Sequence, residues 1–265
     1  MMTEVNEARD WQGESLDCSA CCHNDLRPAG GCKLLQACVR DRYARRIDRF
    51  FSWNRPLAND YLDHPYFEVR AVAAKYADLF HLTRLLKDPD ETVRWSAAQR
   101  LPPRYLRELR RDSHREVRIR VAARVDGSDL FEMRTDEDYY VRTTVARRLP
   151  VPILQLMMND PEASVRRIVA QRIDAGRLAS MAGDPDAGVR LEVAQRLYPH
   201  QLLWLRRDQD CRVRYEVAAR IAAQHLPAML EDAEQMVREL AEQRLSALRA
   251  YASAAPMGQR AEGLS

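Results

Sequence analysis

The chain has 265 residues, of which 46% are hydrophobic, and a formal net charge of only +3. This composition is typical of a folded globular protein, and the small net charge gives little support for a nucleic-acid partner. No apolar run approaches the roughly 18 residues of a membrane-spanning helix, so we expect no membrane association.

Residues 1–17 are polar and acidic, and we expect them to be disordered. They lack the basic and apolar regions of a secretory signal, which predicts a cytoplasmic protein. In a reducing compartment, clustered cysteines bind metals more often than they form disulfides.

Residues 18–40 hold five of the six cysteines and are predicted to form a small metal module. The ligand pattern is Cys18-x2-Cys21 followed by Cys32-x5-Cys38. Four thiolates suit zinc or an iron–sulfur cluster equally well by number. Zinc sites usually use two short C-x2–4-C pairs, whereas a [4Fe–4S] cube is wider and tolerates uneven spacing. The spacing therefore favours iron–sulfur, with zinc, or disulfides and no metal, as alternatives.

Neighbouring residues refine this hypothesis. Adjacent side chains diverge, so Cys21 and Cys22 are not expected to bind one cluster together; the x2 spacing favours Cys21, with Cys22 as its substitute. Gly30-Gly31 permits a tight turn before Cys32. His23 is interpreted as an exposed turn residue. Three basic residues can offset the negative charge of a cluster: Arg27, Lys33 and Arg40.

Residues 65–249 repeat with a period of 24. Val-Arg occurs at positions 69, 93, 117, 141, 165, 189, 213 and 237. Counting each Val as zero, Ala recurs at +5, Arg at +7, Leu at +13, Leu or Met at +16 and Asp at +19. Such self-similarity is the signature of a solenoid, in which each repeat packs only on its neighbours.

Each repeat is predicted to hold one α-helix and one 3₁₀-helix. The Asp at +19 is interpreted as the N-cap of a helix of about 13 residues that ends near the apolar residue at +8. Two apolar anchors three residues apart then suit a short 3₁₀ segment. The predicted fold is therefore an all-α, right-handed solenoid of about eight repeats, the handedness coming from the resemblance described below.

Arginine supplies 39 of the 42 basic residues, and its positions are informative. The Arg at +1 lies within the apolar arc of the helix and so requires partners, either an Asp or free carbonyls. We interpret this series as a structural ladder, with an anion track as the alternative. The Arg at +7 lies at the edge of the arc and is the better candidate for contacting a partner.

The ends of the repeat region are predicted to be caps. Residues 41–64 lack the Val-Arg signature but carry Phe50, Phe51 and Trp53, enough apolar bulk for an N-terminal cap. Glu242 replaces the core Ala in the last repeat. Residues 250–265 have no period and are predicted to be a disordered tail. Cys211 is interpreted as a small apolar filler.

The repeats and the cysteine pattern together resemble the leucine-rich repeat variant family. The matching residues are the Val-Arg…Ala-x-Arg-apolar repeats and the stretch from Cys18 to Asn54. The resemblance implies a right-handed superhelix without β-sheet, and an N-terminal module with a [4Fe–4S] cluster. It implies Cys18, Cys21, Cys32 and Cys38 as ligands. Such proteins resemble products encoded near nitrogen-fixation genes, and no enzymatic activity is attached to the family.

No catalytic constellation is recognisable, so we expect a protein without enzymatic activity. The favoured hypothesis is an interaction scaffold with a protein partner, whose cluster is structural or senses oxygen or iron. The alternatives are a small electron-transfer protein, and binding of a nucleic acid or an acidic partner through exposed arginines.

Overall fold

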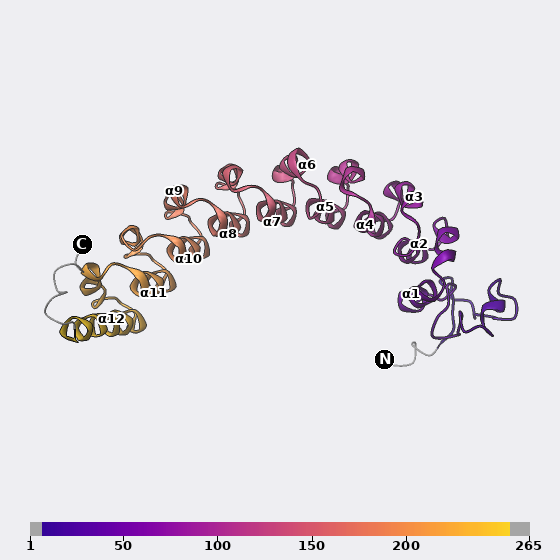
Figure 1. Cartoon of the computed structure of the whole chain (residues 1–265), viewed down its shortest axis with the longest axis horizontal. Helices are drawn as coiled ribbons and strands as arrows, with labels where there is room; N and C mark the ends of the chain where they lie inside the picture. Colours follow the sequence, from indigo (N-terminus) through magenta and orange to yellow (C-terminus); the bar gives the residue numbers. More distant parts are fainter. Residues whose placement is uncertain (1–6, 255–265) are drawn as a thin grey trace. The chain divides into compact units, whose positions relative to one another are not determined.

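The computed structural model describes residues 7–254, with side chains as far as residue 251. The chain divides into two compact units between Val141 and Arg142. No strand occurs in residues 7–254, where the only β-pairing is in two isolated bridges, Arg9 with Ser15 and Lys33 with Ala37. Within each unit the longer α-helices form one layer and the short helical segments form the other (Figure 1).

Most α-helices are about three turns long. The first unit contains α1 (Ala44–Trp53), α2 (Phe67–Ala73), α3 (Leu79–Leu82), α4 (Glu91–Arg100), α5 (Arg115–Ala122) and α6 (Gly127–Glu132). Helix α7 (Tyr139–Arg148) contains the junction between the units. The second unit contains α8 (Ala163–Arg172), α9 (Ala175–Leu178), α10 (Ala187–Arg196), α11 (Cys211–Arg220) and α12 (Gln235–Ala254).

The 3₁₀-helices follow the α-helices in alternation. In the first unit they are η2 (Asn24–Leu26), η3 (Arg55–Tyr61), η4 (Thr83–Lys87), η5 (Pro103–Tyr105), η6 (Arg107–Arg111) and η7 (Met133–Thr135). In the second they are η8 (Val151–Met157), η9 (Ala179–Met181), η10 (Gln201–Leu205) and η11 (Ala223–Met229). The prediction of an all-α solenoid with one α-helix and one 3₁₀-helix per repeat is confirmed.

Three repeats insert a short α-helix before the 3₁₀ segment, which the sequence analysis did not predict. These helices, α3, α6 and α9, start directly after Asp78, Asp126 and Asp174, which are their N-cap residues. The Asp174 side chain accepts a hydrogen bond from the Arg177 N–H. This capping bond favours an α-helical turn in α9, whereas Asp78 and Asp126 are N-cap residues without a side-chain capping bond. Where the same position holds proline, as at Pro102 and Pro150, the segment is 3₁₀ from its start.

The core consists of the repeated apolar positions. The Val at zero, the residue at +4 and the Ala at +5 are buried in the repeats from α4 to α11, and so are the anchors at +13 and +16. Glu242, which replaces the core Ala in the last repeat, is exposed. The period of 24 therefore predicted the core correctly, because each buried position is set by its place in the repeat.

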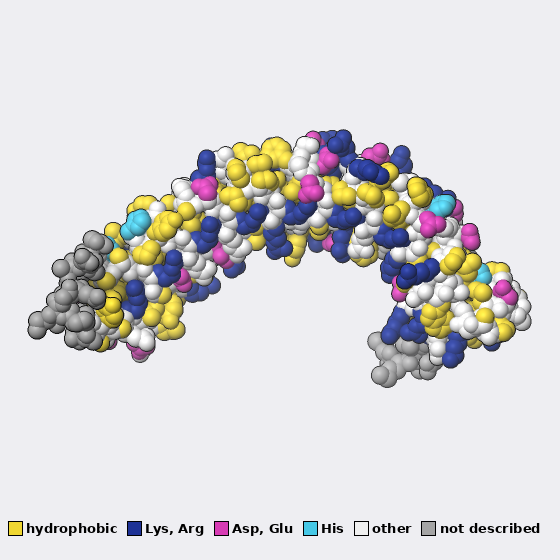
Figure 2. All heavy atoms as spheres, viewed as in Figure 1, with side chains coloured by type: hydrophobic (Ala, Val, Ile, Leu, Met, Phe, Trp, Pro, Cys, Tyr) yellow, Lys and Arg dark blue, Asp and Glu magenta, His cyan; other side chains and the backbone are white. Residues whose placement is uncertain are grey.

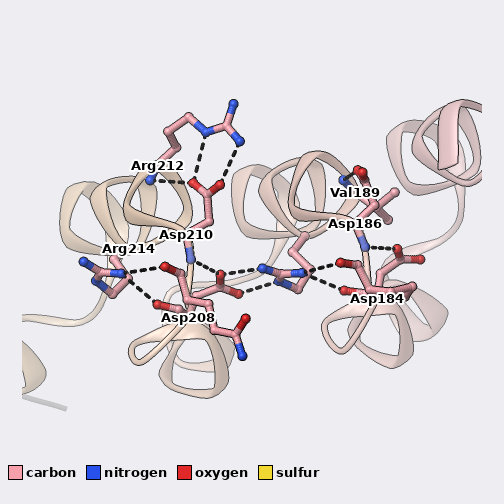
Figure 3. Close-up of polar contacts among 10 residues, drawn as sticks. Asp184, Asp186, Val189, Asp208, Asp210, Arg212 and Arg214 are labelled. Atoms are coloured by element: carbon pink, nitrogen blue, oxygen red, sulfur yellow. Dashed lines mark hydrogen bonds and ion pairs between the residues drawn. The ribbon is translucent and has the colours of Figure 1, made fainter.

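The Arg at +1 forms a ladder of ion pairs, which we call the arginine ladder. Its Nε and Nη2 atoms donate to the two carboxylate oxygens of the Asp 18 residues later, and Nη1 donates to the carbonyl of the Asp six residues earlier (Figure 3). The pairs are Arg70–Asp88, Arg94–Asp112 and Arg118–Asp136 in the first unit, and Arg142–Asp160, Arg166–Asp184, Arg190–Asp208 and Arg214–Asp232 in the second. The structural interpretation of this series is thus supported, since both kinds of expected partner are used.

The sequence analysis predicted that the Asp at +19 caps the α-helix, and this prediction is wrong. Asp88 ends η4, its Oδ1 accepts the Asp90 N–H at 2.9 Å, and Asp90 is the N-cap of α4. The same offset of two residues places Asp186 and Asp210 at the N-caps of α10 and α11. The α-helices therefore begin later than predicted and have about 10 rather than 13 residues, because the first carboxylate is already bound by arginine.

The Arg at +7 was predicted to contact a partner, but six of these arginines bind backbone carbonyls of the protein itself. Each is half-buried, and its Nη1 atom donates to the Ala carbonyl at +5 of the preceding repeat; the six are Arg100, Arg124, Arg172, Arg196, Arg220 and Arg244. Several also reach the carbonyl at +8 of that repeat. Helix C-termini leave carbonyls without intrahelical partners, and these arginines satisfy them.

Both predicted disordered ends are partly ordered. Leu16 N–H donates to the Ala8 carbonyl at 2.9 Å, and Trp11 stacks on Tyr66 with ring centroids 5.7 Å apart. Residues 7–17 therefore pack on the first unit. At the other end, α12 continues to Ala254, so residues 250–254 are helical. The remainder of both predicted segments, residues 1–6 and 255–265, lies outside the described residues.

Residues 41–64 form α1 and η3, and they keep the geometry of a repeat without its signature. Arg46 lies 24 residues before Arg70, and His64 stands where later repeats have Asp. The His64 Nδ1 accepts the Tyr66 N–H at 3.1 Å, as Asp88 accepts that of Asp90. Phe50 and Phe51 are fully buried, whereas Trp53 is 46% exposed and adds little to the core.

Among the described helices, none is long and apolar enough to span a bilayer.

Replacing a ladder arginine should destabilise the fold far more than replacing its exposed neighbour. Arg166 is 9% exposed and its removal leaves the Asp184 carboxylate buried without its partner. We expect Arg166→Ala to lower the free energy of unfolding by about 3–5 kcal/mol. Arg167, on the same helix, is half-exposed, and Arg167→Ala should cost less than about 1 kcal/mol. Urea denaturation followed by circular dichroism compares them, and equal losses would contradict a structural ladder.

The ladder should also make the fold sensitive to acid. Burial alone would raise the pKa of Asp184, but hydrogen bonds from Arg166 and the Asp186 N–H hold it below its ordinary value. Asp112 and Asp232 have lowered pKa values for the same reasons. A lowered pKa stabilises the fold above the unfolded value of about 3.9, and that stability is lost as pH falls through the folded pKa. Urea unfolding at descending pH should show this loss, and Asp184→Asn should lose part of the slope; an unchanged slope would contradict it.

Candidate metal centre

A short turn brings the first two cysteines together. Cys21 N–H donates to the Cys18 carbonyl at 3.4 Å, and Asn24 N–H donates to the Cys21 carbonyl at 3.0 Å. Both Cys18 and Cys21 are half-buried. The C-x2-C spacing thus folds as the sequence predicted, with both side chains on one turn.

The paired glycines form the tight turn expected before Cys32. Gly30 has a φ of +74°, a conformation that favours glycine. A Cβ atom on Gly31 would lie 2.8 Å from Asn54 Oδ1, so only glycine fits there without a shift. The Asn54 Nδ2 donates to the Gly31 carbonyl at 2.7 Å and to the Phe50 carbonyl at 2.8 Å. Asn54 therefore fastens the glycine turn to the end of α1.

The last two cysteines flank a small loop. Lys33 N–H donates to the Ala37 carbonyl at 2.9 Å, and Ala37 N–H donates to the Lys33 carbonyl at 2.7 Å. Leu35, with a φ of +64°, turns the chain between them. Because the bridge closes the loop, Cys32 and Cys38 lie side by side despite the x5 spacing, and both are buried.

Cys32 and Cys38 lie close enough to other predicted ligands for their pKa values to respond to them. Burial raises the pKa of the Cys32 thiol, and Cys21 and Cys18 raise it further, while Arg27 lowers it. Burial raises the pKa of Cys38 to about 12, with Cys32 and Cys21 adding to the effect and an N–H bond from Arg40 opposing it. Because their pKa values are raised, Cys32 and Cys38 would ionise here only with a cation beside them, and the iron of a cluster would supply that charge.

A search of the described residues finds no group of three or more His, Cys, Asp or Glu side chains arranged around one metal ion. That finding concerns a single shared ion. A cube with four cysteine ligands instead takes one thiolate on each iron atom. Of the basic residues predicted to offset cluster charge, Arg27 lowers the pKa of Cys32 through its charge, whereas Arg40 acts on Cys38 through its backbone N–H and Lys33 is exposed.

The fifth thiol lies apart from the other four. Cys22 is exposed. The interpretation of His23 as an exposed turn residue is wrong, because it is half-buried: its Nε2 contacts the Tyr61 hydroxyl, its ring lies 5.2 Å from that of Phe50, and burial lowers its pKa. Cys211 is exposed at the start of α11, so it is not the buried filler that the sequence analysis predicted.

A buried ion pair connects the cysteines to α1. Arg46 Nη1 donates to Asp41 Oδ2 at 2.8 Å and to the Glu7 carbonyl at 3.1 Å, and Asp41 is fully buried. The Arg46 carbonyl in turn accepts the Cys38 N–H at 3.1 Å. The sequence analysis missed this pair, although counting back 24 residues from Arg70 leads to Arg46.

The comparisons with known proteins agree with this geometry. The family model described as "LRV protein FeS4 cluster" matches residues 8–60. A solved structure described as "a leucine-rich repeat variant with a novel repetitive protein structural motif" is 39% identical, with a TM-score of 0.84, over 87% of this chain and 99% of that one. The chain belongs to the leucine-rich repeat variant family. Its cofactor is accordingly a [4Fe–4S] cluster, and the matched region extends beyond the predicted residues 18–40 into α1 and η3.

A curated relative gives a further connection for this leucine-rich repeat variant. It is named "Uncharacterized 27.7 kDa protein in nifB 3'region" and comes from Rhodobacter capsulatus. The two are 50% identical over 101 residues, which is 38% of this chain and 41% of the relative. The match thus spans less than half of that relative's length.

Loss of a ligand should remove the cluster. We expect Cys32→Ser to abolish the brown colour and the visible charge-transfer absorption of anaerobically purified protein, because the remaining three thiolates leave one iron without its ligand. Cys211→Ser, which removes an exposed thiol of the second unit, should keep the colour. Iron analysis and the absorption spectrum measure both variants, and a fully coloured Cys32→Ser protein would contradict the ligand assignment.

Proposed function

We propose that this iron–sulfur repeat protein is a cytoplasmic interaction scaffold whose [4Fe–4S] cluster holds its N-terminal end in shape and thereby makes binding responsive to oxygen or iron. It catalyses no reaction in this proposal. Its resemblance to a product of the nifB region supports a role in cells that fix nitrogen. The partner is a protein, and neither nucleic acid nor membrane is part of the proposal.

The observation that carries the proposal is the small core of the cysteine module. Within residues 18–40 the buried residues are Cys32, Ala37, Cys38 and Val39, so half of them are predicted ligands. So little apolar surface cannot hold a segment of this size without a disulfide or metal. The fold of the module therefore depends on the cluster, and loss of the cluster would free it.

Unfolding of the cysteine module would affect the repeats through a few specific contacts. His23 covers Phe50, and Asn54 bonds both the glycine turn and α1. Phe50 and Phe51 are fully buried, and their rings pack edge to face 5.4 Å apart. If the module loosens, this aromatic pair becomes accessible, so the state of the cluster would change the surface that the first unit offers.

Exposed apolar side chains on the repeats support a protein partner. In the second unit Trp204 is 63% exposed and Leu156 is 60% exposed, both in the layer of short helices, where Figure 2 shows hydrophobic side chains among arginines. Exposed tryptophan and other large apolar groups are enriched in protein interfaces. The ladder and +7 arginines bind groups within the protein, which removes many arginines from any nucleic-acid contact.

The test compares two forms of the protein as bait. Protein loaded with its cluster and protein stripped by a chelator are immobilised anaerobically and exposed to an extract of nitrogen-fixing cells. We expect a partner that distinguishes the two forms, and we expect Leu156→Ala/Trp204→Ala to reduce its retention while the colour stays. Failure of both forms to retain a partner would contradict the scaffold. If the cluster also cycled reversibly by one electron, electron transfer would be the better explanation, which the half-buried Cys18 and Cys21 would permit.

A further inference from the structure

The arginine ladder ends in an arginine without its aspartate. Arg238 on α12 keeps half of the ladder geometry, since its Nη1 donates to the Asp232 carbonyl at 2.6 Å and to the Ala233 carbonyl at 2.8 Å. The ladder Asp should follow 18 residues later, but Pro256 stands there. Within residues 7–254, Nε and Nη2 of Arg238 make no bond. The half-buried guanidinium therefore presents an unoccupied pair of donors.

The preceding pair of the ladder shows what these two donors bind. The Nη1 atom of Arg214 donates to the carbonyls of Asp208 and Gln209, as that of Arg238 does one repeat later. Its Nε and Nη2 then donate to the two carboxylate oxygens of Asp232, at 2.8 and 3.0 Å. A guanidinium held in this way matches the geometry of a carboxylate. The free donors of Arg238 are thus preorganised for a carboxylate.

The last repeat also lacks the short helical segment that would carry the acid. In the preceding repeat α11 is followed by η11, whose anchors Leu226 and Met229 are buried. Helix α12 instead continues to Ala254, so the corresponding positions, 250 and 253, lie in the same helix. Among the described residues, no short segment follows α12 as η11 follows α11.

A leucine beside Arg238 is only partly covered. In the seven other repeats the +8 residue is at most 1% exposed; these residues are Ala77, Leu101, Val125, Leu149, Ile173, Leu197 and Ile221. Leu245, the +8 residue of the last repeat, is half-buried. It follows Arg238 by seven residues, or about two helical turns, so the two side chains share one face of α12. This face combines a free donor pair with uncovered apolar surface.

The other repeats specify which segment would fit there. After each helix they carry Leu at +13, Leu or Met at +16 and Asp at +19, the pattern Leu-x2-Leu/Met-x2-Asp. The apolar residues of these segments are already buried in their own repeats. Residues 255–265 lack the pattern, because Glu262 is their one acid and no Leu or Met lies three or six residues before it. The matching segment must therefore come from another protein.

We propose that α12 is a docking site for a protein partner that supplies a Leu-x2-Leu/Met-x2-Asp segment. The aspartate of this segment binds Nε and Nη2 of Arg238, and its apolar residues cover Leu245. The partner thus completes the last repeat as η11 completes the repeat before it. This inference rests on the proposed scaffold function and names the chemistry by which the partner is recognised.

A synthetic peptide measures this site directly. The probe copies residues 223–234, AQHLPAMLEDAE, which contain the pattern at Leu226, Met229 and Asp232. It carries fluorescein and is titrated with cluster-loaded full-length protein, so that anisotropy gives the Kd. We expect saturable binding that weakens about tenfold or more when the peptide carries Asp232→Asn, because charge-assisted hydrogen bonds are lost. This comparison leaves the protein unchanged and does not depend on the folding of a variant.

Protein variants identify the arginine that binds the peptide. Arg238→Ala should weaken binding by a similar factor and should bind the Asp and Asn peptides equally. Arg238→Lys should restore little of the loss, because an ammonium keeps the charge but lacks the planar pair of donors. Arg249→Ala is the matched control: it removes the same charge from an exposed position of α12 and should bind the peptide as the wild type does.

Three results would overturn the proposal: no saturable binding, equal binding of the two peptides by the wild type, or equal binding by the wild type and Arg238→Ala. Binding seen only with Glu262→Gln would also overturn it, since residues 255–265 would then be the occupant of the site. The assay uses no cell extract. Its failure is therefore distinguishable from a failure of partner capture, which tests the scaffold function.

Discussion

The pairing of one arginine with one aspartate in each repeat is the interaction on which the array depends. Each ladder Asp binds the guanidinium of its own repeat through its carboxylate and that of the following repeat through its carbonyl, as Asp184 does with Arg166 and Arg190. A buried guanidinium without partners would be very costly, and here all three of its nitrogens are used. Register between repeats is therefore specified by directional bonds, while the small apolar columns supply the packing.

The N-terminal end keeps the ladder positions but fills them with different bonding partners. Arg46 keeps the ladder position but pairs with Asp41 inside the cysteine segment, and His64 replaces the aspartate. Tyr61 and Asn54, both on or beside η3, bind the segment that carries the thiols. The first repeat thus holds a module instead of another repeat, and in the proposed function the cluster stabilises this module, which has little hydrophobic core of its own.

The sequence predicted the fold well because the fold depends on spacing, and the cysteine ligand set stays a prediction. A period of 24 fixes which residues are buried, and C-x2-C fixes a turn. The sequence was less informative about side chains whose bonding partners come from another part of the chain. The ladder Asp was assigned to the wrong helix position because its arginine partner was unknown, and Arg220 was assigned to a partner surface although a carbonyl of the preceding repeat binds it. The environment of His23 depends on Tyr61, 38 residues later, which no local pattern identifies.

The double use of each ladder aspartate has a consequence for how such arrays change length. Suppose that a deletion within a unit begins and ends at the same position of two repeats. The Arg before the new junction then still has an Asp 18 residues after it, because every repeat has the same pair. Whole repeats can thus be deleted or duplicated in a gene without leaving an unmatched charge, whereas insertion of a few residues would separate every contact across the join. The bonding pattern therefore tolerates a change in the number of repeats but not a change in their period.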